Sequence, residues 1–356
     1  MKPIAKNSMK PLKKQLCFCL LTLFVVVGGS HTTPVVAQDY VLNMQHFLPE
    51  RSTIPAKFLT PWARKVERES NNRIKINVFP SMQLGGKPLG LFDQISDGII
   101  DLGWTLPGYN PGRFASVEAF ELPFMMTNAP ATSRALNAFV DLHGGDDFAA
   151  VKVIALHVHG PGLIHAKGEG VRSLEDMDGK RVRGPTRVIN ALIKKAGATP
   201  IGLPVPIVPE ALSRGVIDAT VIPWEVTNAL KVEELTQTHT EFAGDKALYT
   251  STFVFAMNQA KYESLPKELQ QVIDNNSGPE TGAWASQMMV NADAPARQVA
   301  IDRGNTIVTI DGDELTRWNK VGNAVITDWI AEMEAAGRNG QKMVEDARAL
   351  IEQQSR

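Results

Sequence analysis

The residue of this chain with the clearest chemical potential is Arg183, which ends the segment Gly179-Lys180-Arg181-Val182-Arg183. We interpret this segment as a strand whose carboxyl end faces a cleft between two α/β lobes, because ligands of open α/β sheets bind at that end. A guanidinium offers a rigid fork of donors that matches a carboxylate, so Arg suits the binding of a small acid better than Lys does. On this motif alone, a solvated Arg on a charged loop is an equal alternative.

Two proline-containing segments are predicted to form the rim of the same pocket. They are Pro204-Val205-Pro206 and Ile222-Pro223-Trp224-Glu225. Proline restrains a loop before folding, which suits a preformed pocket. Trp224 could stack on a ligand, and Glu225 could accept a hydrogen bond from a hydroxyl or an amine. The alternatives are a Trp224 buried between the lobes and a solvated Glu225.

Further candidates lie near the predicted strands of the first half. His46 leaves the first strand at its carboxyl end and could donate to a carboxylate or a hydroxyl, with a core histidine as the alternative. Trp104 could form a pocket wall or belong to the core. Tyr109 and Phe114, on the following loop, are weaker candidates.

Three histidines close together in the sequence, His157, His159 and His165, suggest a metal site. Alternate residues of a strand point the same way, so His157 and His159 could bind one ion. A zinc site needs more ligands than two, and no third or fourth one stands at a diagnostic spacing. We therefore predict no metal and no cofactor, and expect one of these histidines to line the cleft.

Motifs of the common enzyme classes are absent from the sequence. There is no Gly-x-Ser-x-Gly elbow, no His-Glu-x-x-His and no dinucleotide fingerprint after the first strand, and Gly85-Gly86-Lys87 is not followed by Ser or Thr as a Walker loop requires. The sequence therefore predicts a binding protein and not an enzyme. Because catalytic triads are spatial, the alternative is a periplasmic enzyme that acts on a small carboxylic acid through His46 or the pair His157 and His159.

Residues 1–37 have the pattern of a cleaved secretory signal peptide. Five lysines precede the apolar run Leu16 to Val27, and Val35-Val36-Ala37 fits a cleavage site before Gln38. The twelve residues of that run are too few to span a bilayer of about 30 Å. The sequence thus predicts a periplasmic protein that is mildly acidic after cleavage. Both cysteines lie in this segment, so the mature chain has no disulfide, and no basic run suggests nucleic acid.

A short motif that occurs twice predicts the two lobes. Residues 97–104 and 214–221 both read as a helix that ends on a glycine and leads into an apolar strand. Around the first copy we expect a parallel βαβαβ unit, with strands at 40–47, 73–78 and 99–104 and helices at 52–70 and 91–96. Pro61 is expected to begin the regular part of the first helix, with Thr60 as its cap.

The second half repeats this rhythm. Strands are predicted at 181–183 and 199–202, helices at 188–197 and 209–214, and a strand at 250–257 that returns to the first lobe. A long helix at 279–303, a strand at 305–310 and two amphipathic helices follow. The chain crosses between the lobes near residues 160–163 and 248–251, which are the candidate hinges. The predicted lobes are 38–160 plus 250–288, and 161–249 plus 289–356.

The motifs along the mature chain resemble those of the periplasmic solute-binding proteins of tripartite ATP-independent periplasmic (TRAP) transporters, of the DctP type. The segments that carry this resemblance are 79–86, 97–101, 121–124, 174–183, 197–200 and 210–218. The family implies a two-lobed periplasmic-binding-protein-like α/β fold, in which each lobe is a mainly parallel sheet flanked by helices and a long helix contacts both lobes. It also implies closure around a small organic acid, whose carboxylate pairs with the Arg that is Arg183 here, and delivery to the small and large membrane subunits of a TRAP permease.

Two departures from the family pattern bear on the ligand. Many sugar-acid-binding relatives carry Asn where this chain has Ile222, and the metal-bridged keto-acid branch has an acidic residue and Trp in place of Val221 and Ile222. Both departures remove polar partners, so we predict a less polar monocarboxylate and no sialic acid. The predicted ligand-binding residues are Arg183, His46, Trp104, Val205, Ile222, Trp224, Glu225 and His165. A binding protein of an ABC importer or sensor is the remaining alternative.

Overall fold

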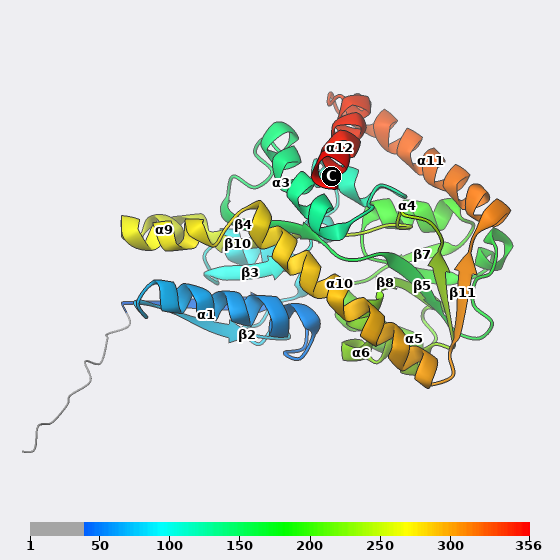
Figure 1. The fold of residues 1–356 in the computed structure, drawn as a ribbon, viewed down its shortest axis with the longest axis horizontal. Coiled ribbons are helices and arrows are strands. Elements are labelled where there is room, and N and C mark those ends of the chain that lie inside the picture. Colours follow the sequence, from blue (N-terminus) through cyan, green and yellow to red (C-terminus); the bar gives the residue numbers. More distant parts are fainter. Residues whose placement is uncertain (1–38) are drawn as a thin grey trace, which may run out of the picture. The chain divides into compact units, whose positions relative to one another are not determined.

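The computed structural model describes residues 39–356, which form two β-sheets surrounded by helices (Figure 1). The predicted signal peptide and its cleavage site lie outside the described residues. Within the described part of the chain, no helix has both the length and the apolar character needed to cross a bilayer.

The first sheet has the strand order β2-β1-β3-β10-β4. Its strands are β1 (Tyr40–His46), β2 (Ile74–Phe79), β3 (Leu102–Thr105), β4 (Val151–Val158) and β10 (Thr252–Asn258). The first three are parallel, as predicted, and α1 (Thr60–Glu69) and α2 (Leu91–Ser96) lie in the crossovers between them. In contrast, β10 is antiparallel to both of its neighbours.

The second sheet has the order β11-β9-β5-β8-β6-β7. Its strands are β5 (Gly162–Ala166), β6 (Arg181–Gly184), β7 (Thr199–Gly202), β8 (Ala219–Pro223), β9 (Thr238–Phe242) and β11 (Thr306–Ile310). β6 is parallel to β7 and β8, whereas β5 is antiparallel to β8 and β9. Each sheet is therefore mixed. The antiparallel strands β5 and β10 enter their sheets directly from the other half of the chain, without the helical crossover that parallel pairing between consecutive strands requires.

Helices cover both sheets. Besides α1 and α2 they are α3 (Ala129–His143), α4 (Arg187–Lys195), α5 (Val208–Ser213), α6 (Thr227–Leu230), α7 (Val232–Leu235), α8 (Gln259–Glu263), α9 (Lys267–Asn275), α10 (Pro279–Asp302), α11 (Gly312–Ala335) and α12 (Gly340–Gln354). The long helix α10 packs on α3 and β4 of the first half, and on α6 and the 3₁₀ turn at Trp224–Val226 of the second (Figure 1). The expected helix that contacts both halves is thus present.

The C-terminal helices divide between the two halves. α11 packs on α4, whereas α12 packs on α3, which belongs to the first half of the chain. The predicted lobe boundaries had placed residues 289–356 together in the second lobe. The helix α12, whose buried residues include Met343 and Val344, packs on α3 of the first half as well as on α11.

The repeated motif forms the same corner in both halves. Gly98 and Gly215 have φ angles of +73° and +66°, a conformation that glycine adopts at the end of a helix without strain. In each copy the following aspartate holds a neighbouring strand. Asp101 Oδ2 accepts from Asn43 N at 2.7 Å, and Asp218 Oδ2 accepts from Arg181 N at 2.9 Å. The repeated motif therefore has a structural role, because its aspartate fixes a neighbouring strand in each half of the chain.

One local expectation was wrong. The first helix continues through Thr60, which caps nothing, and it begins before Pro61 with a π-helical turn at Pro55–Leu59. Thr60 N donates to Pro55 O, five residues earlier. Because Pro61 has no N–H to donate, it cannot make the usual helical hydrogen bond, and the wider π-helical turn lies directly before it.

Candidate functional site

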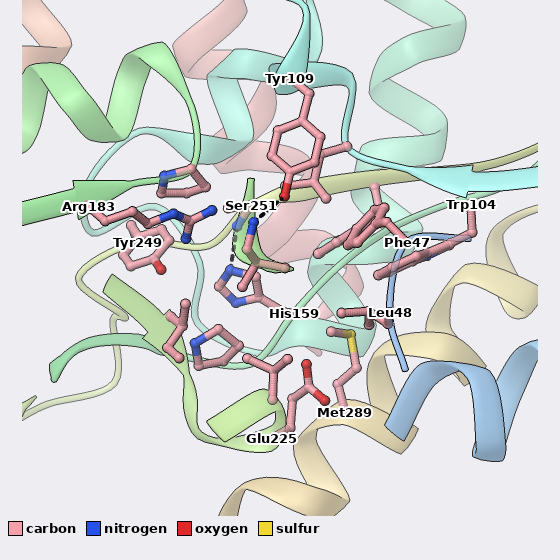
Figure 2. Close-up of a pocket in the computed structure, with 17 residues that line it drawn as sticks. Phe47, Leu48, Trp104, Tyr109, His159, Arg183, Glu225, Tyr249, Ser251 and Met289 are labelled. Carbon is pink, nitrogen blue, oxygen red and sulfur yellow. Dashed lines mark hydrogen bonds between the residues drawn. The ribbon is translucent and has the colours of Figure 1, made fainter. Parts of the chain in front are cut away.

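A cavity lies where strand ends of both sheets approach one another (Figure 2). The first sheet contributes Trp104 from β3 and Phe253 from β10, and the second contributes Arg183 from β6 and Ile222 from β8. β8 also contributes Pro223. The other lining residues lie in turns or in connections next to strands, namely Phe47, Leu48, Leu106, Tyr109, His159, Pro185, Val205, Glu225, Val226, Tyr249 and Ser251, with Met289 on α10. The wall is mainly aromatic and aliphatic, with a few polar groups, which is typical of a small-molecule site.

Arg183 is held rigidly with part of its guanidinium free to bind a ligand. Its side chain is 1% exposed. Nε donates to Leu203 O at 2.7 Å and Nη1 donates to Val221 O at 3.2 Å, whereas Nη2 is buried without a hydrogen-bond partner among the described residues. The alternative of a solvated Arg183 is therefore wrong. Two backbone carbonyls therefore orient the guanidinium. Its remaining N–H groups are free to donate to a ligand in the cavity.

The charge of Arg183 has no acidic counterpart in the described chain. No Asp or Glu of residues 39–356 lies within 4.0 Å of its guanidinium. Burial lowers its pKa, while the nearby Tyr109 and Tyr249 oppose that shift. A buried charge without a partner is costly, because desolvation is not offset by attraction. The arrangement is suited to an anion that enters the cavity.

Stacked aromatic rings form one wall. The ring centroids of Phe47 and Trp104 are 5.0 Å apart, and those of Trp104 and Phe253 are 4.7 Å apart with an angle of 8° between the planes. Trp104 Nε1 donates to His157 Nε2 at 2.8 Å, and burial lowers the pKa of His157 to about 3. His157 therefore stays neutral and fixes the indole. The wall is rigid and offers flat apolar surface.

His159 lines the cavity but its ring nitrogens are both occupied. Nε2 accepts from Ser251 N at 3.0 Å, so Nδ1 carries the proton and donates to Gly160 O at 2.5 Å. Burial lowers the pKa of His159 to about 4. The expectation that one of the clustered histidines lines the cleft agrees with this position. Among the described residues, no group of three or more His, Cys, Asp or Glu is placed to hold a metal ion.

Glu225 is buried in the cavity wall. The residue is 5% exposed, so the alternative of a solvated Glu225 is wrong. Burial raises the pKa of Glu225 to about 8, and the negative charge of Asp293 is the second cause of this shift. Its Oε2 has no hydrogen-bond partner among the described residues. At neutral pH this carboxyl is therefore mainly protonated and able to donate as well as accept.

Of the predicted residues, Arg183, Trp104, Val205, Ile222 and Glu225 line the cavity. His46, His165 and Trp224 do not. His46 is fully buried, and burial lowers its pKa to about 4, so it is a neutral core residue. Trp224 turns towards β9, where its Nε1 donates to Glu241 Oε1 at 2.8 Å.

His165 supports the cavity from behind. Asn305 Nδ2 donates to His239 Nε2 at 2.9 Å, His239 Nδ1 donates to His165 Nδ1 at 2.7 Å, and His165 Nε2 donates to Ile222 O at 3.2 Å. In this arrangement the proton of His239 is on Nδ1 and that of His165 is on Nε2, so that every contact has one donor. This series of hydrogen bonds fixes the backbone of Ile222, whose side chain lines the cavity.

Several lining residues were missed from the sequence. Phe47 and Leu48 directly follow His46, so the prediction chose the right strand end and the wrong residue. Tyr249 and Ser251 lie in the segment that was interpreted only as a hinge. Met289 lies in the middle of α10 and has no local signal, because only the tertiary fold brings it to the cavity.

Gly162 makes room for the Tyr249 ring, and this gives a first prediction. A methyl group at residue 162 would lie 2.1 Å from Cε1 of Tyr249, which is 1% exposed. We expect Gly162→Ala to lower the free energy of unfolding by about 1–3 kcal/mol, as overpacking does. Urea unfolding measures this, with Gly90→Ala as the control, because nothing lies within 4 Å of the Cβ position there. Equal stabilities of the two variants would contradict the packing argument.

Comparison with known proteins agrees with this geometry. The family model described as bacterial extracellular solute-binding protein, family 7 (DctP), matches residues 44–332. A TRAP solute-binding protein of an unidentified marine microbe, solved with 3-hydroxybenzoate, is 45% identical with a TM-score of 0.88, over 90% of this chain and 100% of that one.

Two further structures are similar. A TRAP solute-binding protein of Rhodoferax ferrireducens T118, solved with copurified benzoate, is 43% identical with a TM-score of 0.87, over 88% of this chain and 98% of that one. A TRAP periplasmic solute-binding protein of Bordetella bronchiseptica, solved with (R)- and (S)-mandelate, is 26% identical with a TM-score of 0.81, over 88% and 99% of the chains. The resemblance seen in the sequence is thus confirmed, and the chain belongs to the DctP family of extracellular solute-binding proteins, the receptors of TRAP transporters.

Proposed function

We propose that this protein captures an aromatic monocarboxylate in the periplasm and delivers it to the membrane subunits of a TRAP permease. The observation that carries the proposal is the buried, unpaired guanidinium of Arg183 in a cavity walled by aromatic rings. The guanidinium would bind the carboxylate through the donors that Leu203 and Val221 leave free. The rings of Phe47, Trp104 and Phe253 offer flat surface for an aromatic body.

The distribution of charge favours one carboxylate over two. Arg183 is the one Lys or Arg among the residues that line the cavity, and the other ionisable lining residues are uncharged or acidic groups. A second carboxylate on the ligand would therefore be desolvated without a partner. Relatives solved with benzoate, 3-hydroxybenzoate and mandelate support the same ligand class.

Capture is proposed to work by closure of the two lobes. A ligand that touches residues of both sheets binds the closed form better and shifts the population towards it. The connections at 160–163 and 248–251 are the proposed hinges. Ser251 and Tyr249, which line the cavity, lie in the second of them, so ligand contact and hinge position are directly linked.

An enzymatic function finds less support in the site. The family consists of solute receptors. The ring nitrogens of His159 are occupied by protein groups, and His157 Nε2 accepts from Trp104. His46 does not line the cavity. None of the three is thus placed as a base for a ligand bound at Arg183.

Thermal unfolding with a panel of acids tests the proposal. The mature protein, refolded to remove carried-over ligand, is heated with benzoate and its hydroxylated derivatives, with malonate and with glucuronate. A ligand at about 100 times its Kd adds roughly 2.7 kcal/mol of stability, so we expect at least one aromatic acid to raise the Tm by several degrees. A shift with malonate or glucuronate and none with any aromatic acid would overturn the proposed ligand class.

A further inference from the structure

Glu225 is a polar group in the cavity wall that carboxylate binding by Arg183 does not use. Its carboxyl lies near the apolar lining residues Leu48 and Met289 and reaches the cavity from a different side than Arg183 does (Figure 2). An unpaired polar group that is 5% exposed costs free energy unless a ligand satisfies it. Benzoate bound at Arg183 has no group that could do so.

The backbone of Glu225 is held from two other elements. Its N–H donates to Asp293 Oδ1 on α10 at 2.9 Å, and its carbonyl accepts from Thr53 Oγ1 at 3.3 Å. Asp293 is itself accommodated by Gly160, where a Cβ would lie 2.2 Å from Asp293 Oδ2. These contacts preorganise the residue, which is the property expected of a group that selects a ligand.

We propose that Glu225 selects acids that carry a hydroxyl group on the ring, away from the carboxylate that Arg183 binds. The Glu225 carboxyl and the ligand hydroxyl form a hydrogen bond inside the cavity, and a ligand without that hydroxyl leaves Oε2 unpaired. This inference rests on the proposed function and makes it narrower: the ligand is a hydroxylated aromatic monocarboxylate. The proton state of the residue agrees, because a protonated carboxyl can both donate to and accept from a hydroxyl.

A site built to bond a hydroxyl discriminates strongly against an analogue that lacks it, since its own polar group is then buried without a partner. We therefore expect at least one of the three monohydroxybenzoates to bind the parent protein at least about tenfold more tightly than benzoate does. A further probe, isophthalate, carries a second carboxylate at the meta position of the ring and is expected to bind more weakly than benzoate.

Isothermal titration calorimetry at pH 7 measures these affinities for the parent and for three variants. Glu225→Leu is expected to reduce the preference for the hydroxylated acid to about onefold. Glu225→Gln, whose amide still forms hydrogen bonds, keeps most of the preference and serves as the variant that tests the idea if Glu225→Leu does not fold. Met289→Leu, an apolar change in the same wall, alters both affinities by a similar factor.

The outcomes separate the two proposals. Equal affinity of the parent for benzoate and all three hydroxybenzoates, or a preference that survives in Glu225→Leu, overturns the selection by Glu225 and leaves the proposed ligand class intact. Failure of every aromatic acid to bind the parent overturns the proposed function and this inference with it. Tighter binding of isophthalate than of the hydroxybenzoates also contradicts the inference, because the Glu225 side of the cavity would then select a carboxyl group and not a hydroxyl group.

Discussion

Arg183→Ala is expected to lower the affinity for the bound acid by more than 100-fold. The guanidinium is 1% exposed and would be the only positive partner of the ligand carboxylate among the residues that line the cavity. Truncating one partner of a buried, hydrogen-bonded charge pair costs about 3–5 kcal/mol, which corresponds to roughly two to four orders of magnitude in Kd. Calorimetric titration with the best acid of the panel measures the loss.

The same strand provides the control. Arg181 lies two residues earlier on β6, and its side chain points to solvent, where it pairs with Asp218 at 2.8 Å. An exposed ion pair contributes little, so Arg181→Ala should bind the acid with nearly unchanged Kd. Arg183→Lys keeps the charge and loses the planar fork, so its affinity should fall between those of the parent and Arg183→Ala. Equal affinities of Arg183→Ala and the parent would refute a carboxylate clamp at this position.

The position of Arg183 could be predicted because it depends on local sequence and on a general rule. Strand β6 and its parallel neighbours β7 and β8 are recognisable as short segments that each follow a glycine, and parallel strands direct their carboxyl ends to the same edge. Ile222 and Val205 follow from the same rule, since each lies at or just after a strand end of the second sheet.

The wrong predictions concern the direction in which a single side chain points from the backbone. Trp224 and Glu225 are neighbours in a 3₁₀ turn, yet one faces β9 and the other faces the cavity. Likewise His46 faces the core, and Phe47, one residue later, faces the ligand site. A sequence pattern identifies the turn or the strand end, but the direction of each side chain there depends on packing between distant segments.

The stability of the ligand-free protein should depend strongly on pH, because five buried histidines must remain neutral. Burial lowers the pKa of His46, His159 and His239 to about 4 and that of His157 to about 3, and it holds the pKa of His165 well below 6.5. In the unfolded chain each imidazole titrates near 6.5. Below that pH the unfolded state binds protons that the folded state does not, so acid favours unfolding.

Buried carboxyls with raised pKa values oppose this effect, and the shift is largest for three of them. Burial raises the pKa of Glu121 and Asp293 to about 7 and that of Glu225 to about 8. Each is protonated in the folded state at a pH where the unfolded chain has released the proton. Their contribution to stability is therefore complete below about pH 4 and is lost as the pH rises towards 7–8.

The balance between the two sets predicts a maximum of stability near pH 6.5. Between pH 5 and 6 the imidazoles outnumber the carboxyls, so the free energy of unfolding should fall on acidification, by at most about 2.7 kcal/mol for each pH unit. Above pH 6.5 the folded state binds more protons through its buried carboxyls than the unfolded chain binds through its imidazoles, so stability declines again until about pH 8. Urea unfolding followed by tryptophan fluorescence from pH 5 to 8 measures both slopes.

A variant isolates the contribution of one imidazole to the acid slope. His239→Asn removes one of the five groups, so the slope between pH 5 and 6 should fall by about 1.4 kcal/mol per pH unit even though the variant is less stable at every pH. Because the slope counts protons, it is insensitive to the packing cost of the substitution. A free energy of unfolding that stays constant from pH 5 to 6.5 in the parent would mean that these histidines accept protons inside the folded protein, and the neutral contacts that fix Trp104 and Ile222 would then have to be reassigned.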